Sequence, residues 1–131
     1  MPDSVEIDED GLYECLSNER RRAVIHVLAS LRPPVTKSEL ADRVTLFIHG
    51  PQYSSQDRKR VLIGLHQAHL DTLENHGVIE EIAGRKQAFE PTPLAFALDE
   101  LRAAIEDVVV VDAGHTSLRE RLAATGGGAD V

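Results

Sequence analysis

Basic side chains gather at one predicted helix start and could bind an anionic polymer there. Arg58, Lys59 and Arg60 form the densest basic cluster outside the first predicted helix. Cations at a helix N-terminus oppose the helix macrodipole, so they cost stability unless an anion lies near. Such residues pair with phosphates, and an arginine can also bind O6 and N7 of guanine. This pattern predicts contact with DNA; the alternative is a solvated helix face with Arg–Glu pairs.

Two further places could add contacts to a phosphate backbone. Arg85 and Lys86 lie at the tip of a predicted hairpin, which suits either the DNA backbone and minor groove or an ordinary polar turn. Lys37 and Ser38 begin a predicted helix, whose free N–H groups suit a phosphate. A capping box with a solvated lysine explains these two residues equally well, so both interpretations stay open.

Three consecutive arginines, Arg20 to Arg22, begin the first predicted helix. Consecutive helix positions point in different directions, so the three cannot all face one partner. We expect at least one of them to pack or to bridge to an acid such as Glu19 or Asp42. A DNA contact by another of them is the alternative.

His66, His69 and His76, with Cys15, are the residues from which a metal site could be built. Histidines three positions apart share a helix face. His69, however, falls in a predicted apolar stripe, which favours a buried core histidine. No Gly-rich phosphate loop, nucleophile elbow or metal-hydrolase motif is present in the sequence. We therefore predict no enzyme activity, no cofactor and no metal site.

The net charge is acidic but unevenly spread. The chain has 14 Lys+Arg and 22 Asp+Glu, a formal charge of −8, which taken alone argues against a polyanionic partner. Residues 1–15 carry −6, residues 16–92 carry +2 and residues 93–131 carry −4. The middle is slightly basic, so the net charge does not exclude DNA. Excess acid with only 3 lysines against 11 arginines resembles proteins of halophilic archaea, whose negative surfaces keep them soluble.

The 131 residues suffice for about one domain with one core. No apolar run approaches the ~20 residues that span a bilayer, and the first residues lack the basic and apolar regions of a signal peptide. A single cysteine, Cys15, excludes an internal disulfide. We expect a soluble cytoplasmic protein without a membrane partner.

Apolar spacing and capping signals predict two helices in the first half of the chain. The first has Ser17 as its N-cap and runs over about 17–31, ending before a Pro-Pro pair. Thr36 and Glu39 form a capping-box pattern for the second, over about 37–47. The side chains of the second helix expected to face the core are Leu40, Val44 and Phe47.

A third, long helix is predicted over about 55–76, followed by a β-hairpin with strands at 78–82 and 87–90. Gly64 lies inside this helix, which costs roughly 1 kcal/mol relative to alanine and indicates a kink or a close approach by another group. The residues expected on its inner face are Leu62, Leu65, His69, Leu70 and Leu73.

A fourth helix is predicted from Pro93 onward. Its apolar seam either covers the core of the same chain or forms a dimer contact, and we favour the dimer. The seam consists of Leu94, Leu98, Leu101, Ile105 and Val108. The expected organisation is an acidic disordered tail (1–11), a main domain (12–92), a C-terminal dimerisation helix (93–112) and a flexible tail (113–131).

Three segments in this order resemble the ArsR-type repressors. Residues 16–25 (LSNERRRAVI) look like the opening of their Arg-rich first helix, residues 35–41 (VTKSELA) like their second helix, and residues 69–79 (HLDTLENHGVI) like the end of their recognition helix. The resemblance covers about residues 16–90 and extends to an uncharacterised haloarchaeal group of such proteins. It implies an α+β, mainly helical winged helix-turn-helix domain that dimerises and binds DNA.

One departure concerns the third helix. Ala41 and His69 are 28 positions apart, more than in the family pattern, and the excess lengthens this helix and the loop before it. The resemblance places the base-reading positions just before His69. These positions are Gly64, Gln67 and Ala68, whereas the extension carries Gln56, Arg58, Lys59 and Arg60.

The sequence therefore predicts a homodimeric DNA-binding regulator of transcription. Its third helix would read double-stranded DNA and its hairpin would contact the flanking backbone. The runner-up is a winged-helix adaptor that binds another protein and no DNA. The expected DNA-binding residues are Lys37, Ser38, Gln56, Arg58, Lys59, Arg60, Gln67, Arg85 and Lys86.

Overall fold

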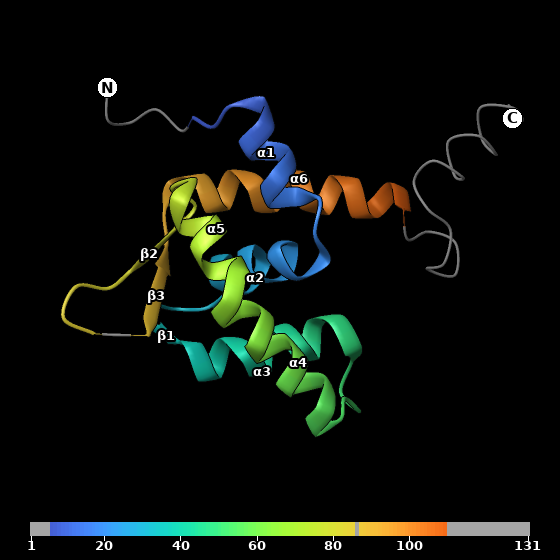
Figure 1. The fold of residues 1–131 in the computed structure, drawn as a ribbon. Helices are drawn as coiled ribbons and strands as arrows, with labels where there is room; N and C mark the ends of the chain where they lie inside the picture. The colour runs from blue at the N-terminus through green and yellow to red at the C-terminus, as the bar shows by residue number, and fades with distance from the viewer. Residues whose placement is uncertain (1–5, 86, 110–131) are drawn as a thin grey trace, which may run out of the picture. The chain divides into compact units, whose positions relative to one another are not determined.

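The computed structural model describes residues 6–85 and 87–109, and it shows an α+β, mainly helical chain with a small antiparallel sheet (Figure 1). This confirms the predicted α+β, mainly helical class. Residues up to Asp99 belong to one unit, and Glu100 begins a second. The elements are α1 (Glu9–Leu16), α2 (Glu19–Ser30), β1 (Val35–Thr36), α3 (Lys37–His49), α4 (Ser55–Gly64), the π-helical segment η1 (Leu65–His69), α5 (Leu70–Asn75), β2 (Ile79–Glu81), β3 (Ala88–Pro91) and α6 (Pro93–Val109).

Helix α1 begins inside the stretch that we assigned to a disordered tail. The Asp8 carboxylate accepts a hydrogen bond from the Gly11 N–H at 2.7 Å and so caps the helix. Glu9 and Asp10 in the first turn also favour a helix N-terminus. The tail prediction is therefore wrong for residues 9–11, while residues 1–5 and the predicted tail at 113–131 lie outside the described residues.

Helix α2 is capped by Asn18 rather than by Ser17. The Asn18 side chain accepts hydrogen bonds from the N–H groups of Arg20 and Arg21. Ser17 instead follows the last residue of α1, and its N–H donates to Tyr13 O. The predicted helix start was thus one residue too early, because α1 continues to Leu16.

Helix α3 packs against α2 on one side and α4 on the other. Thr36 caps it by accepting from Glu39 N. Leu40 and Val44 are buried as predicted, but Phe47 is 42% exposed and its ring lies beside that of His26, with 4.7 Å between ring centroids. The prediction that Phe47 faces the core is therefore wrong.

The long third helix is present, but it is interrupted by the π-helical segment η1. The Leu70 N–H donates to Leu65 O, one residue further back than in an α-helix. A Cβ added to Gly64 would lie 3.3 Å from Cδ2 of His69. Gly64 is thus the last residue before the π-helical segment, and the His69 side chain lies close to it. Both features agree with the irregularity that a glycine inside the predicted helix indicated.

The β2–β3 hairpin is part of a three-stranded sheet with the order β1-β3-β2. Val35 pairs with Phe89, and Glu80 pairs with Glu90, both antiparallel. The hairpin was predicted, whereas β1 was not. A strand of two residues is too short to show the alternation of apolar and polar residues that is typical of strands. Strand β1 is therefore recognised only by its pairing with β3. The sheet and the hairpin lie to one side of α2–α5 (Figure 1).

The α6 seam serves partly as core. Leu94 and Leu98 are 7% and 3% exposed, so they cover the core of their own unit, which was the alternative to the dimer contact. Leu101 is 40% exposed and Ile105 is half-buried. The Val108 side chain lies outside the described part of the structure. Among the described residues, each helix is too short or too polar to cross a membrane.

Candidate nucleic-acid interface

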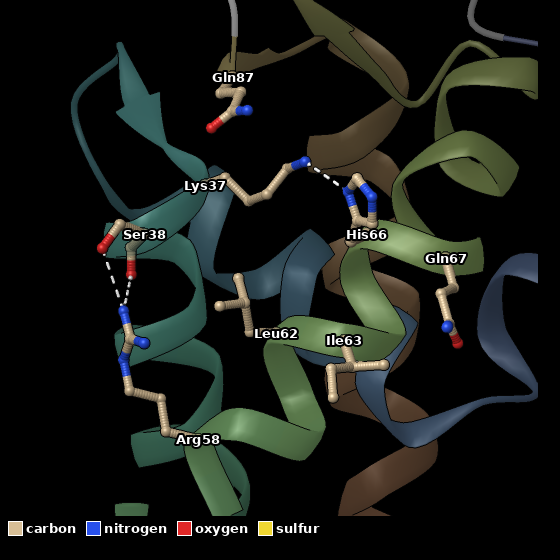
Figure 2. Close-up of a pocket in the computed structure, with 8 residues that line it drawn as sticks. All are labelled: Lys37, Ser38, Arg58, Leu62, Ile63, His66, Gln67 and Gln87. Carbon is tan, nitrogen blue, oxygen red and sulfur yellow. Dashed lines mark hydrogen bonds between the residues drawn. The ribbon is translucent and has the colours of Figure 1, made fainter.

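A groove of about 460 Å³ opens between the start of α3, the outer face of α4–η1 and the residue before β3 (Figure 2). Antiparallel pairing of β1 with β3 brings Gln87 beside the α3 N-terminus, where the Lys37 N–H donates to Gln87 O at 2.7 Å. The groove therefore joins three separate parts of the sequence. Its lining residues are Lys37, Ser38, Arg58, Leu62, Ile63, His66, Gln67 and Gln87.

Arg58 is held against α3 rather than pointing free into solvent. Its Nε donates to the Asp42 carboxylate, and its Nη2 donates to Ser38 O at 3.1 Å and to Ser38 Oγ at 3.0 Å. Arg58 therefore fixes α4 to the start of α3. The alternative interpretation of this cluster was a solvated helix face with Arg–Glu pairs. In the structure the acid is Asp42, and its charge balances that of Arg58.

Lys37 crosses the groove and meets His66. Its Nζ lies 3.1 Å from His66 Nδ1, and both side chains are drawn toward each other in Figure 2. An ammonium group can only donate, so Lys37 is the donor in this contact. This contact holds the Lys37 charge over the groove, close to the N-terminus of α3.

The remaining predicted DNA contacts lie at two exposed places. Gln56, Lys59 and Arg60 are exposed on α4 outside the groove lining, and Arg85 is exposed in the turn before β3. Lys86 lies outside the described residues. The groove thus unites four of the nine predicted residues, namely Lys37, Ser38, Arg58 and Gln67.

The arginines that begin α2 bind the end of α1. Arg21 Nε donates to Glu14 O at 2.8 Å and Arg22 Nη1 donates to Leu16 O at 2.7 Å. Carbonyl groups at a helix C-terminus lack intrahelical partners and carry partial negative charge. We expected at least one of the three arginines to pack or to bridge to an acid such as Glu19 or Asp42; Arg21 and Arg22 also donate to backbone carbonyls of α1.

His69 is a core histidine, 9% exposed, and its Nδ1 lies 3.2 Å from Arg21 Nη1. Burial, together with the charges of Arg21 and Arg20, lowers its pKa. Within residues 6–85 and 87–109 there is no group of three metal-ligating side chains. Cys15 is fully buried, and burial raises the pKa of its thiol to about 11, which keeps it protonated.

We expect His69 to make stability fall with acidity. Because its folded-state pKa is lowered below 6.5, the unfolded chain takes up a proton that the folded chain does not as the pH drops through 6.5. The unfolding free energy of the wild type should therefore decrease between pH 7.5 and 5.5 more than that of His69→Gln, by up to about 1.4 kcal/mol per pH unit. Urea denaturation at both pH values measures this, and equal slopes would contradict it.

Four residues that line the groove were not predicted from the sequence to lie there. They are Leu62, Ile63, His66 and Gln87. Gln87 has φ +64, the left-handed region that a non-glycine residue seldom adopts. Ile63 is an apolar residue on the otherwise polar face of the third helix. This break in the pattern was the one feature of the sequence that could have marked a groove residue. Nothing in the sequence links residues 37, 66 and 87 before the sheet is known.

Comparison with known proteins gives one match. A family model described as a domain of unknown function (DUF7344) matches residues 13–87, which span α1 to the groove residue Gln87. No curated protein matches, and no solved structure matches.

Proposed function

The chain belongs to the DUF7344 family, and from its groove and element order we propose that it is a DNA-binding regulator of transcription. In this proposal α4–η1–α5 is the recognition helix of an ArsR-like winged helix, and it reads duplex DNA. The β2–β3 hairpin is the wing and contacts the flanking backbone. The chain acts in the cytoplasm as a homodimer, and it is not an enzyme.

The order of elements supports the winged-helix assignment. Helix α2, strand β1, helices α3 and α4–η1–α5, and strands β2 and β3 follow one another along the chain. In such domains a helix–turn–helix unit precedes a hairpin, and the second helix of the unit enters the major groove. Here Lys59, Ile63 and Gln67 on the outer face of α4–η1 are exposed, as this docking requires.

The observation that carries the proposal is the groove between α3 and α4–η1, whose lining includes Lys37, Ser38 and Arg58. Lys37 and Ser38 offer an ammonium group and a hydroxyl group, both of which bind phosphate oxygens. Lys59 and Arg60 are exposed one turn away from it on α4. Cations and hydrogen-bond donors that can bind phosphates thus lie on both sides of an exposed helix. This arrangement suits a DNA duplex that lies across the helix.

The proposed homodimer is supported by the symmetry of DNA sites and by the exposed apolar residues of α6. A two-fold dimer matches a palindromic operator with half-sites about 34 Å apart. Leu94 and Leu98 are used by the core, so the dimer contact would involve the exposed apolar residues of α6. Phe96 is 49% exposed and Leu101 is 40% exposed.

One observation favours the adaptor function instead. Asp42 balances the charge of the groove residue Arg58, and Leu46 and Phe47 are exposed at the end of α3, at 40% and 42%. An apolar pair on a helix face suits a protein partner better than DNA. We retain the winged-helix adaptor as the second candidate.

In vitro selection from random duplexes of about 30 bp, followed by fluorescence anisotropy, tests DNA binding. The acidic composition points to a halophilic archaeal host, so binding is measured at about 0.1 M and about 2 M KCl. We expect enrichment of a palindromic sequence and an affinity tighter than the nonspecific 10⁻⁴–10⁻⁶ M. No enrichment and no anisotropy change at either salt concentration would favour the adaptor.

A further inference from the structure

Ile63 is an apolar side chain left in water on the outer face of the third helix. It is 43% exposed, whereas Val61 and Leu65 of the same helix are fully buried and make the core contact. Lys59 and Gln67, one turn before and after it, are polar and exposed. The core therefore does not account for an isoleucine at this position, and a contact outside the chain would.

Resting on the proposed DNA binding, we propose that Ile63 is a specificity-determining residue that packs on the C5-methyl group of thymine. The thymine methyl is the apolar group that a base pair presents in the major groove, and contact with an apolar side chain is one way in which proteins recognise it. Ile63 thus selects A·T pairs at one position of each half-site, without forming a hydrogen bond.

The geometry of the face agrees with this assignment. A helix with side chains is about 10–12 Å across, and the major groove is about 12 Å wide. In Figure 2, Ile63 and Gln67 lie on the part of the helix away from the Arg58–Ser38 contact. The carboxamide of Gln67 can pair with N6 and N7 of adenine. A methyl contact and an adenine contact one helical turn apart together define an A·T-containing site.

The surroundings of Ile63 favour DNA over a protein as the occupant. Protein interfaces depend on clusters of large apolar side chains buried together. Ile63 has one apolar neighbour in the groove, Leu62, and its other neighbours there are polar or cationic, with Lys59 and Arg60 on its own helix and Lys37 across the groove. The positive charges of these three residues suit the phosphates on either side of a base pair.

The test replaces thymine by deoxyuridine in the duplex selected with the full chain. This substitution removes the C5-methyl group and leaves base pairing and charge unchanged. We expect the wild type to lose about fourfold in affinity at one thymine of each half-site, the value of one buried methyl group. Ile63→Ala should bind the thymine duplex more weakly and should not distinguish the two duplexes, while Ile63→Val should keep part of the difference.

Leu46→Ala is the matched control, because Leu46 is an exposed apolar residue on another helix, 40% exposed. It should retain the full preference for thymine. If the wild type binds DNA but thymine and deoxyuridine duplexes bind equally, or if Ile63→Ala keeps the same difference as the wild type, the assignment of Ile63 is overturned and DNA binding stands. If the wild type binds no duplex, the proposed function itself fails and this inference fails with it.

Discussion

Leu65→Ala should lower the free energy of unfolding by about 2–5 kcal/mol, the cost of a cavity left by a buried leucine. Leu65 is fully buried and begins the π-helical segment. A domain of this size has about 5–15 kcal/mol of stability in total, so a large share would be lost. Urea denaturation followed by circular dichroism at 222 nm measures the change.

Ile63→Ala is the matched control for this prediction, two residues earlier on the same helix. Since Ile63 is 43% exposed, its truncation should cost less than about 1 kcal/mol. The two variants separate the inner from the outer face of the helix, and Ile63→Ala is at the same time the variant that tests base reading. Equal losses in both would show that the helix is turned differently about its axis.

Periodicity was sufficient to predict the helices and their inner faces where the pattern is long. Leu65, Leu70 and Leu73 were expected inside and are buried, as is His69. Gly64 indicated an irregularity, and the structure has a π-helical segment there. These features are local, because the spacing of apolar residues and one glycine determine them within a single element.

The features that the sequence did not reveal depend on contacts between distant segments. Strand β1 has two residues and is defined by its pairing with β3, more than fifty positions later. Asp42 and Arg58 are sixteen positions apart and meet because α3 and α4 pack together. Phe47 fits the helical period but lies beyond the edge of the core, beside His26. Period alone does not show where a core ends.

The Asp42–Arg58 pair changes the interpretation of the basic cluster. From the sequence alone, the three basic residues Arg58, Lys59 and Arg60 are equivalent cations at a helix start. In the structure Arg58 has an acidic partner, so the pair as a unit adds no net charge to the groove. Lys59 and Arg60 are exposed on α4. If DNA binds this face, these two residues supply the electrostatic contribution from α4.

The double variant Lys59→Ala/Arg60→Ala should therefore weaken DNA binding about 100-fold for each bound subunit at about 0.1 M salt. Each phosphate contact changes the slope of log K against log salt by about 0.9, which corresponds to nearly tenfold in affinity at that salt concentration. The slope should fall by about 2 for each bound subunit, and the loss should shrink toward molar salt. Anisotropy titrations of the selected duplex over a series of KCl concentrations measure both quantities.

Two double variants serve as controls for this result. Asp42→Ala/Arg58→Ala removes the balanced pair without changing the net charge, and it should alter affinity by less than about threefold. Arg32→Ala/Arg43→Ala removes two exposed cations that do not line the groove, and it should leave most of the salt slope in place. If the Asp42/Arg58 variant loses as much affinity as the Lys59/Arg60 variant, Arg58 leaves Asp42 to bind DNA. If the Arg32/Arg43 variant loses as much, the attraction comes from overall charge and not from α4.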